Sequence, residues 1–155
     1  MNVQAPIARE ELVPTVIADR SAHFRETLRR VLDQSHRAAV AGEAGTLRDA
    51  LSLVRRTGAR LVLLDIQLVM GQPAGRLRRI ADKLPAVTVI VLLDDDLPEY
   101  RTAIADRWGY ACISKESAAS ELPRAIPALL AGHNPRRSPA YGGLPSGHTV
   151  STSRE

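Results

Sequence analysis

Leu61-Val62-Leu63-Leu64-Asp65 is a run of four aliphatic residues that ends in an aspartate. No polar residue interrupts the run at alternate positions, as it would in a strand with one face in water. A continuous apolar run of this length is typical of a parallel strand that is covered on both faces by helices. The run therefore predicts a buried parallel strand with a carboxylate at its C-terminal end.

Similar apolar runs precede and follow this segment, and amphipathic stretches separate them. The other predicted strands are Val16–Ala18, Ala38–Ala41, Val87–Leu93 and Ala111–Ile113. Between and after the strands, apolar residues recur three and four positions apart, which indicates helices with one buried face. The predicted inward-facing helix residues are Phe24, Leu28, Val31 and Leu32, then Leu47, Leu51 and Val54, then Leu77, Ile80, Ala81 and Leu84, then Tyr100, Ile104 and Trp108, and finally Leu122, Ile126, Leu129 and Leu130. This alternation predicts an α/β fold, a flavodoxin-like three-layer sandwich with a five-stranded parallel sheet and helices on both faces.

Capping and breaking residues set the expected ends of these elements. Gly42 is expected to close the second strand, and Ser117 or Ser120 is expected to cap the last helix. If Ser120 is the cap, Pro123 falls in the first turn, where proline is tolerated. Pro127 lies deeper in the helix and is expected to remove a backbone hydrogen bond and bend it.

The chain has 155 residues, which suits one domain with extensions at both ends. Residues 1–13 carry no sustained pattern and are expected to form a flexible N-terminal extension. Residues 14–131 form the predicted domain. Residues 132–155 are rich in Pro, Gly, Ser, His and Arg, which is typical of a linker or disordered tail.

The bulk composition narrows the class of protein. The formal net charge is +4, but only 3% of residues are aromatic, so a solvated arginine-rich surface is favoured over a nucleic-acid site. The single cysteine, Cys112, excludes a disulfide framework and fits a reducing cytoplasm. No apolar stretch has membrane-spanning length, and Met1–Pro14 lacks the pattern of a signal peptide. We therefore expect a cytoplasmic protein without a membrane partner.

Charged side chains follow three of the predicted strands. Asp19 follows the first strand, Asp65 ends the third, and Lys115 follows the fifth. In a doubly wound parallel sheet, the carboxyl ends of the strands form the site, and the first and third strands are neighbours. The sequence therefore predicts that two carboxylates and one ammonium converge at one edge of the sheet.

The segments VIADRS (16–21), LVLLDI (61–66) and ISKES (113–117) resemble the three signature segments of receiver domains in two-component signalling. The resemblance covers roughly Thr15–Gly132. It implies that Asp65 is the phosphoacceptor, that Lys115 pairs with the phosphoryl group, and that Asp19 and Asp65 bind Mg²⁺. In such a site a carboxylate attacks the phosphoryl group, and cations neutralise the charge on its oxygens.

Three positions depart from the family pattern. Arg20 stands where the family has the acid that binds the metal directly, so we expect magnesium binding to be weakened or lost and Arg20 to pair with Asp65. Leu93 stands where a Ser or Thr hydroxyl normally contacts the phosphoryl group. Cys112 replaces the family's switch aromatic. We also expect Arg20 to be at least half-buried.

Asp94-Asp95-Asp96 follows the fourth strand and is expected to overhang the site. One interpretation is a solvated loop or a helix cap, and the other is a replacement metal ligand. Both interpretations stay open on the sequence alone.

The last residues of the chain, VSTSRE (150–155), resemble the opening of the helix-turn-helix domain of LuxR/NarL-type response regulators. The resemblance implies a non-enzymatic, receiver-like signalling domain of a bacterial transcriptional regulator, with weak or no aspartyl phosphorylation. Its expected partners are a histidine kinase or another protein, and a second copy of the chain in a homodimer. DNA binding is expected through a C-terminal domain absent from this sequence, and not by this chain alone. The alternatives are an ordinary receiver phosphorylated at Asp65 and a small flavodoxin-like enzyme or cofactor binder.

Overall fold

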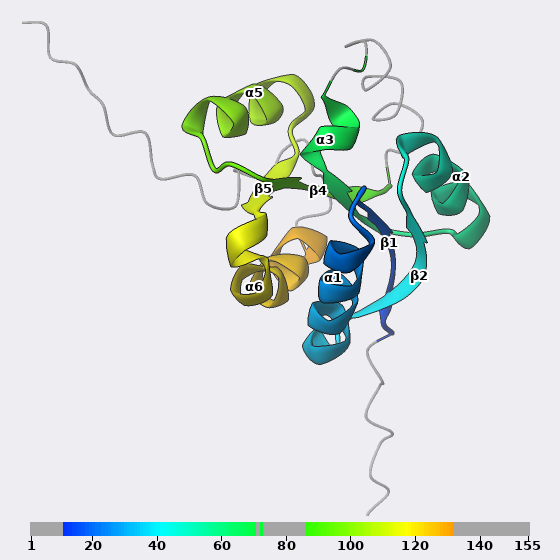
Figure 1. The fold of residues 1–155 in the computed structure, drawn as a ribbon. Helices are drawn as coiled ribbons and strands as arrows, with labels where there is room; N and C mark the ends of the chain where they lie inside the picture. The colour runs from blue at the N-terminus through cyan, green and yellow to red at the C-terminus, as the bar shows by residue number, and fades with distance from the viewer. Residues whose placement is uncertain (1–10, 71, 73–85, 132–155) are drawn as a thin grey trace, which may run out of the picture.

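The computed structural model describes residues 11–70, 72 and 86–131 (Figure 1). The strands are β1 (Val13–Ala18), β2 (Ala38–Ala44), β3 (Leu61–Asp65), β4 (Thr88–Leu93) and β5 (Ala111–Ser114). The helices are α1 (Ala22–Ser35), α2 (Leu47–Thr57), α3 (Ile66–Val69), α5 (Pro98–Trp108) and α6 (Ala118–Ala131), and the 3-10 turn η1 (Lys115–Ser117) precedes α6. The predicted helix around Leu77–Leu84, the extension 1–10 and the tail 132–155 lie outside the described residues.

The five strands form one sheet in the order β2-β1-β3-β4-β5, and every neighbouring pair is parallel. The fold predicted from the sequence is therefore confirmed. This order places β1 beside β3, so that Ala18 is paired with Leu64. The residues that directly follow these partners, Asp19 and Asp65, consequently leave the sheet side by side.

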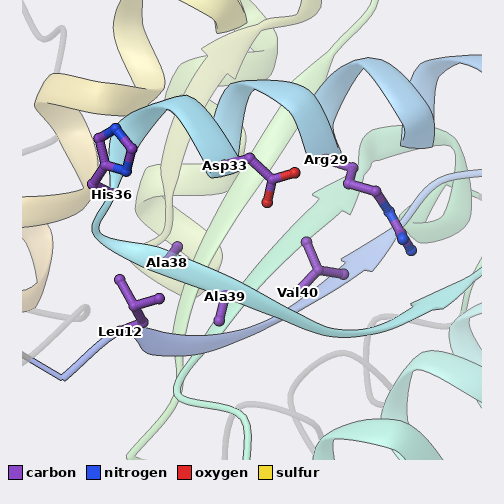
Figure 2. Close-up of a pocket in the computed structure, with 7 residues that line it drawn as sticks. All are labelled: Leu12, Arg29, Asp33, His36, Ala38, Ala39 and Val40. Atoms are coloured by element: carbon purple, nitrogen blue, oxygen red, sulfur yellow. The ribbon is translucent and has the colours of Figure 1, made fainter.

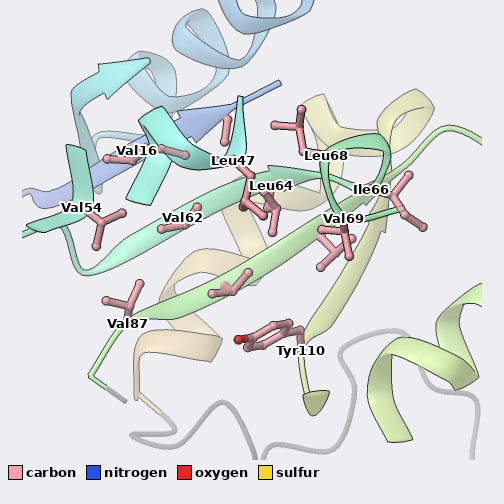
Figure 3. Packing of buried hydrophobic residues seen from close by; sticks show 14 of the residues in the cluster. Val16, Leu47, Val54, Val62, Leu64, Ile66, Leu68, Val69, Val87 and Tyr110 are labelled. Atoms are coloured by element: carbon pink, nitrogen blue, oxygen red, sulfur yellow. The ribbon is translucent and has the colours of Figure 1, made fainter. Parts of the chain in front are cut away.

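The two faces of the sheet carry separate apolar cores. In Figure 1, α1 and α6 lie together on one face, and α2, α3 and α5 lie on the other. Aliphatic residues from β1, β3 and β4 fill the core on the second face, which Figure 3 shows from close by. Because both faces are covered, the strands are apolar at successive positions, which is the pattern from which the parallel sheet was predicted.

Strand β2 is longer than the sequence predicts, because it continues through Gly42 to Ala44. Gly42 does not end the strand. An added Cβ at this position would lie 3.0 Å from a methyl group of Leu53 in α2. The glycine therefore allows the helix to pack closely on the strand, which is a different role from the termination that we expected.

Helix α6 begins at Ala118, so Ser120 lies inside it and Pro123 falls beyond the first turn. The expected cap at Ser120 and the first-turn position of Pro123 are therefore wrong, whereas Ser117, the other predicted cap, directly precedes the helix. The cause is that Ser114 caps the preceding 3-10 turn, and its hydroxyl accepts a hydrogen bond from Glu116 N at 3.3 Å. The helix continues through Pro123 and Pro127 to its end. At the other end of the domain, β1 begins at Val13, one residue before the predicted boundary at 14.

Two helix ends differ in the residue that adopts the left-handed conformation. Helix α2 ends at Gly58 (φ 66°), whereas α1 ends at His36 (φ 53°). Because a side chain is strained there, Gly58→Ala should lower the free energy of unfolding by about 1 kcal/mol. His36→Gly should raise it by about 0.5 kcal/mol. Urea denaturation followed by circular dichroism measures both changes, and equal effects of the two variants would contradict the assignment.

Candidate functional site

The site lies at the carboxyl edge of the sheet, where strand ends place three charged residues. Asp19 follows β1, Asp65 ends β3, and Lys115 follows β5. The two aspartates are each only 1% exposed, and the Lys115 side chain is 17% exposed. Burial of ionised groups is costly unless they are paired, so the arrangement of these side chains must supply partners.

Lys115 is the centre of the site. Its Nζ lies 2.9 Å from Asp19 Oδ2, 3.1 Å from Asp65 Oδ1 and 2.9 Å from Asp94 Oδ1. An ammonium group has three protons, so one lysine can serve all three carboxylates. The predicted convergence of Asp19, Asp65 and Lys115 is present, and Asp94 joins it. We call these four residues the Lys115 cluster.

Further N–H groups occupy the remaining carboxylate oxygens of the cluster. Ser21 N donates to Asp19 Oδ1 at 2.8 Å, and Gln67 N donates to Asp65 Oδ1 at 3.0 Å. The Gln67 side chain donates from Nε2 to Asp94 Oδ2 at 2.9 Å. Asp65 Oδ2 faces Arg20, whose backbone N lies 3.5 Å away and whose Nε lies 3.6 Å away. All six oxygens of the three carboxylates therefore face a nitrogen of this chain, but the buried Asp19 Oδ2 has only the ion-pair contact with Lys115 and no hydrogen bond of good geometry.

The electrostatics of the cluster favour the charged forms. Burial acts to lower the pKa of Lys115, but hydrogen bonds to Asp19, Asp94 and Asp65 outweigh it and hold that pKa above its usual value. Burial acts to raise the pKa of Asp94, but the hydrogen bonds from Lys115 and Gln67 lower it. The Lys115 ammonium also lies 5.1 Å from the centre of the Phe24 ring, which adds a cation–π contact.

Arg20 approaches Asp65 as predicted, but its environment differs from the expectation. The Arg20 side chain is 61% exposed, so the prediction of an at least half-buried guanidinium is wrong. Arg20 lies beyond the end of β1, where its side chain is largely exposed to solvent. Its contact with Asp65 is therefore a screened ion pair, whereas the contacts of Lys115 with Asp19 and Asp65 are shielded from water.

The side chains of Leu93 and Cys112 belong to the apolar core. Leu93 is fully buried, and Cys112 is 4% exposed in the same core. Burial, the largest cause, raises the pKa of the Cys112 thiol to about 11, which disfavours a reactive thiolate. The Cys112 carbonyl accepts a hydrogen bond at 3.0 Å from Arg101, whose guanidinium also pairs with Asp96. Arg101 thus links α5 to β5 and is held by Asp96, while Asp94 points to Lys115.

Sequence reasoning did not identify the roles of Asp94 and Gln67. Asp94 has two identical neighbours in the chain, so nothing in the sequence separates it from them. Gln67 follows Asp65 by two positions, which is the spacing at which an aspartate accepts a backbone N–H at a helix start. That spacing could have predicted the backbone contact but not the side-chain bridge to Asp94.

The receiver resemblance implies a magnesium ion, and most of the carboxylate oxygens that would bind it are engaged by nitrogens of this chain. Magnesium requires carboxylate oxygens that are free to point at it in octahedral geometry. Here these oxygens are directed to Lys115, to backbone N–H groups and to Arg20. Within the described ranges, no group of three or more His, Cys, Asp or Glu residues is arranged to hold a metal.

A hollow lies away from the cluster, between the C-terminal half of α1 and the first residues of β2 (Figure 2). Its volume is about 300 Å³. The lining residues are Leu12, Arg29, Asp33, His36, Ala38, Ala39 and Val40. None of them belongs to the Lys115 cluster, so this hollow contributes nothing to the site.

Comparisons with known proteins agree with this geometry. The chain is 25% identical over 123 residues to the transcriptional regulatory protein YxjL of Bacillus subtilis. The aligned residues cover 79% of this chain and 56% of YxjL. It therefore spans little more than half of that relative. No protein-family model matches the chain.

Solved structures of receiver domains have the same fold. The NarL signal receiver domain of Mycobacterium tuberculosis matches with a TM-score of 0.68 and 24% identity over 79% of this chain and 98% of that one. A LuxR-family response regulator of Aurantimonas matches with a TM-score of 0.68 and 25% identity, over 80% of this chain and 89% of that one. The isolated receiver domain of Salmonella RcsB with the phosphomimetic BeF₃⁻ matches with a TM-score of 0.69 and 22% identity, over 80% of this chain and 92% of that one. Separately, no helix in the described part of this chain is long and apolar enough to cross a membrane.

Proposed function

We propose that this chain is an atypical receiver. The premise is that it has the fold of response-regulator receiver domains and resembles them in sequence. In this proposal it is the signalling domain of a bacterial response regulator and accepts phosphate at Asp65 weakly or not at all. It acts through protein–protein contacts to control transcription. Its location is the cytoplasm, and DNA is bound by a further, C-terminal domain of the regulator.

The occupied carboxylates of the Lys115 cluster carry this proposal. Phosphoryl transfer to an aspartate needs an oxygen that is free to attack and groups that neutralise the charge on the transferred phosphoryl group. At Asp65, Oδ1 accepts from Gln67 N and contacts Lys115, and Oδ2 faces Arg20. Leu93 has no hydroxyl to donate. The site therefore lacks several of the contacts that would stabilise the transferred group.

The partner proposal follows from the same resemblance. A histidine kinase or another signalling protein would contact the edge of the sheet that carries the cluster, and a second copy of the chain would form a homodimer. The ordinary phosphorylated switch is the second candidate function. One observation favours it, because Lys115 Nζ lies 3.1 Å from Asp65 Oδ1 and a phosphoryl group on Asp65 would have a cation beside it.

Labelling with a small-molecule phosphodonor separates the two candidates. The wild-type chain, incubated with phosphoramidate and Mg²⁺, should show little added phosphate by intact mass spectrometry. Arg20→Asp with Leu93→Thr should raise the labelled fraction about tenfold, because the double substitution restores an acid and a hydroxyl. A tenfold change corresponds to roughly 1.4 kcal/mol of activation free energy, which one such contact can supply. Asp65→Asn in that background should abolish the label.

Two controls keep this experiment interpretable. Circular dichroism must show that the doubly substituted chain is folded, since Leu93 is fully buried. Arg20→Asp alone changes an exposed side chain and provides a variant with an intact core. Rapid, high-yield labelling of the wild-type chain at Asp65 would reject the atypical receiver and establish the ordinary switch.

A further inference from the structure

A small hollow lies directly beside the Lys115 cluster. It has a volume of about 40 Å³ and lies between the segment that follows β3 and the segment that follows β4. Its lining residues are Ile66, Gln67, Met70, Asp94, Asp95 and Tyr100. Gln67 and Asp94 also belong to the hydrogen-bond network of the site, so anything bound in the hollow touches that network.

Apolar side chains are exposed in the segments that form the hollow. Met70 is 50% exposed and Leu97 is 45% exposed, and these are two of the three large hydrophobic residues exposed in the described part of the chain. Met70 lines the hollow itself, and Leu97 precedes α5, where its carbonyl accepts from Tyr100 N at 3.0 Å. Met70 is thus an exposed apolar side chain at the edge of a depression, a position that suits contact with a protein partner.

The charged lining residues that the structure describes have one sign. At neutral pH they are Asp94 and Asp95, and none of the described lining residues is basic. Asp94 is engaged internally, with one oxygen on Lys115 and the other on Gln67. The Asp95 carboxylate is exposed and makes no hydrogen bond or ion pair with a side chain of the described residues. A partner with a cation at this point would complement it.

We propose that the hollow, here called the Asp95 groove (Ile66, Gln67, Met70, Asp94, Asp95 and Tyr100), binds a segment of a partner protein that presents an arginine or lysine between apolar side chains. The cation pairs with Asp95, and a flanking apolar side chain covers Met70. The size fits the end of one side chain and is far below the 300–1,000 Å³ of small-molecule sites. The inference rests on the proposed function and specifies the surface and chemistry of its protein partner.

The position of the groove explains how a partner would be coupled to the site. A cation that pairs with Asp95 would lie next to Asp94. The Asp94 carboxylate contacts Lys115 through one oxygen and accepts a hydrogen bond from Gln67 through the other. The Gln67 side-chain amide lines the groove and donates to Asp94. It is therefore a direct reporter of occupancy in a nitrogen–proton correlation spectrum.

The test is a titration of the full chain with a capped pentapeptide that has arginine at its centre, leucine on each side of it and alanine at both ends. Nuclear magnetic resonance should show shifts of the backbone amides of Gln67, Asp95 and Tyr100 and of the Gln67 side-chain amide. Asp95→Asn should weaken binding about fivefold, which corresponds to about 1 kcal/mol for an exposed ion pair. Asp106→Asn removes an exposed acid from α5 outside the groove and should leave the affinity unchanged.

The peptide with glutamine in place of arginine should bind about fivefold more weakly than the arginine peptide. Absence of shifts with the arginine peptide, shifts located elsewhere, or equal binding to the wild-type and Asp95→Asn chains would each overturn the proposal. The phosphodonor assay on the same sample distinguishes this failure from failure of the proposed function. If the chain is not labelled and does not bind the peptide, only the groove proposal fails. If the chain is labelled rapidly, the proposal of an atypical receiver fails.

Discussion

Replacing Lys115 by methionine should lower the free energy of unfolding by about 3 to 5 kcal/mol, the range expected when one partner of a buried ion pair is removed. The ammonium lies within 3.1 Å of three carboxylates, and two of these are 1% exposed. Methionine keeps the apolar stem and removes the charge, so the carboxylates lose their shared counter-charge. Chemical denaturation at pH 7 measures the loss.

Two further variants identify the cause of that loss. Asp65→Asn in the Lys115→Met background should recover part of the stability, because it removes one of the uncompensated charges. Arg48→Met removes a positive charge at an exposed position of α2 and should change the stability by no more than about 0.5 kcal/mol. A Lys115→Met chain as stable as the Arg48→Met chain would show that the cluster contributes nothing to folding.

The pH dependence of the wild-type chain has a definite sign. The pKa of Lys115 is higher in the folded protein than its usual value, because of its hydrogen bonds to the carboxylates. Folding therefore favours the protonated form, and the contribution of Lys115 is fully present below pH 10.5 and is lost as the pH rises through the folded pKa. The comparison of variants at pH 7 thus takes place where this lysine is fully charged.

Leu122→Ala should cost about 2 to 5 kcal/mol, because it opens a cavity in the core between α6 and the sheet. Leu122 is fully buried and packs in the core shared with α1. Leu97→Ala makes the same chemical change at a residue that is 45% exposed and should cost no more than about 0.5 kcal/mol. Thermal denaturation should separate the two variants clearly, and similar midpoints would contradict the assignment of this core.

The sequence was sufficient to predict the sheet and the position of the site, since both depend on patterns within short segments. Continuous apolar runs predicted the parallel strands, and their polar endings predicted that Asp19, Asp65 and Lys115 would meet. The contact between Arg20 and Asp65 also followed from the order of the strands. Each of these predictions needs only the topology and not the details of packing.

The remaining features depend on packing between segments that the sequence does not encode locally. The selection of Asp94 over its neighbours is decided by the turn between β4 and α5, which points one carboxylate to Lys115 and another to Arg101. Gly42 was interpreted as a strand end, because its close approach to Leu53 involves a different element. The exposure of Arg20 similarly depends on how far the chain extends beyond β1.

The Lys115 cluster joins residues that come from four separate parts of the chain, after β1, at the end of β3, after β4 and after β5. Because such contacts need all of these strands in place, we expect them to form late in folding. Interactions absent from the folding transition state act on the rate of unfolding and leave the rate of folding almost unchanged. We therefore expect the cluster to lengthen the lifetime of the native domain once it is formed.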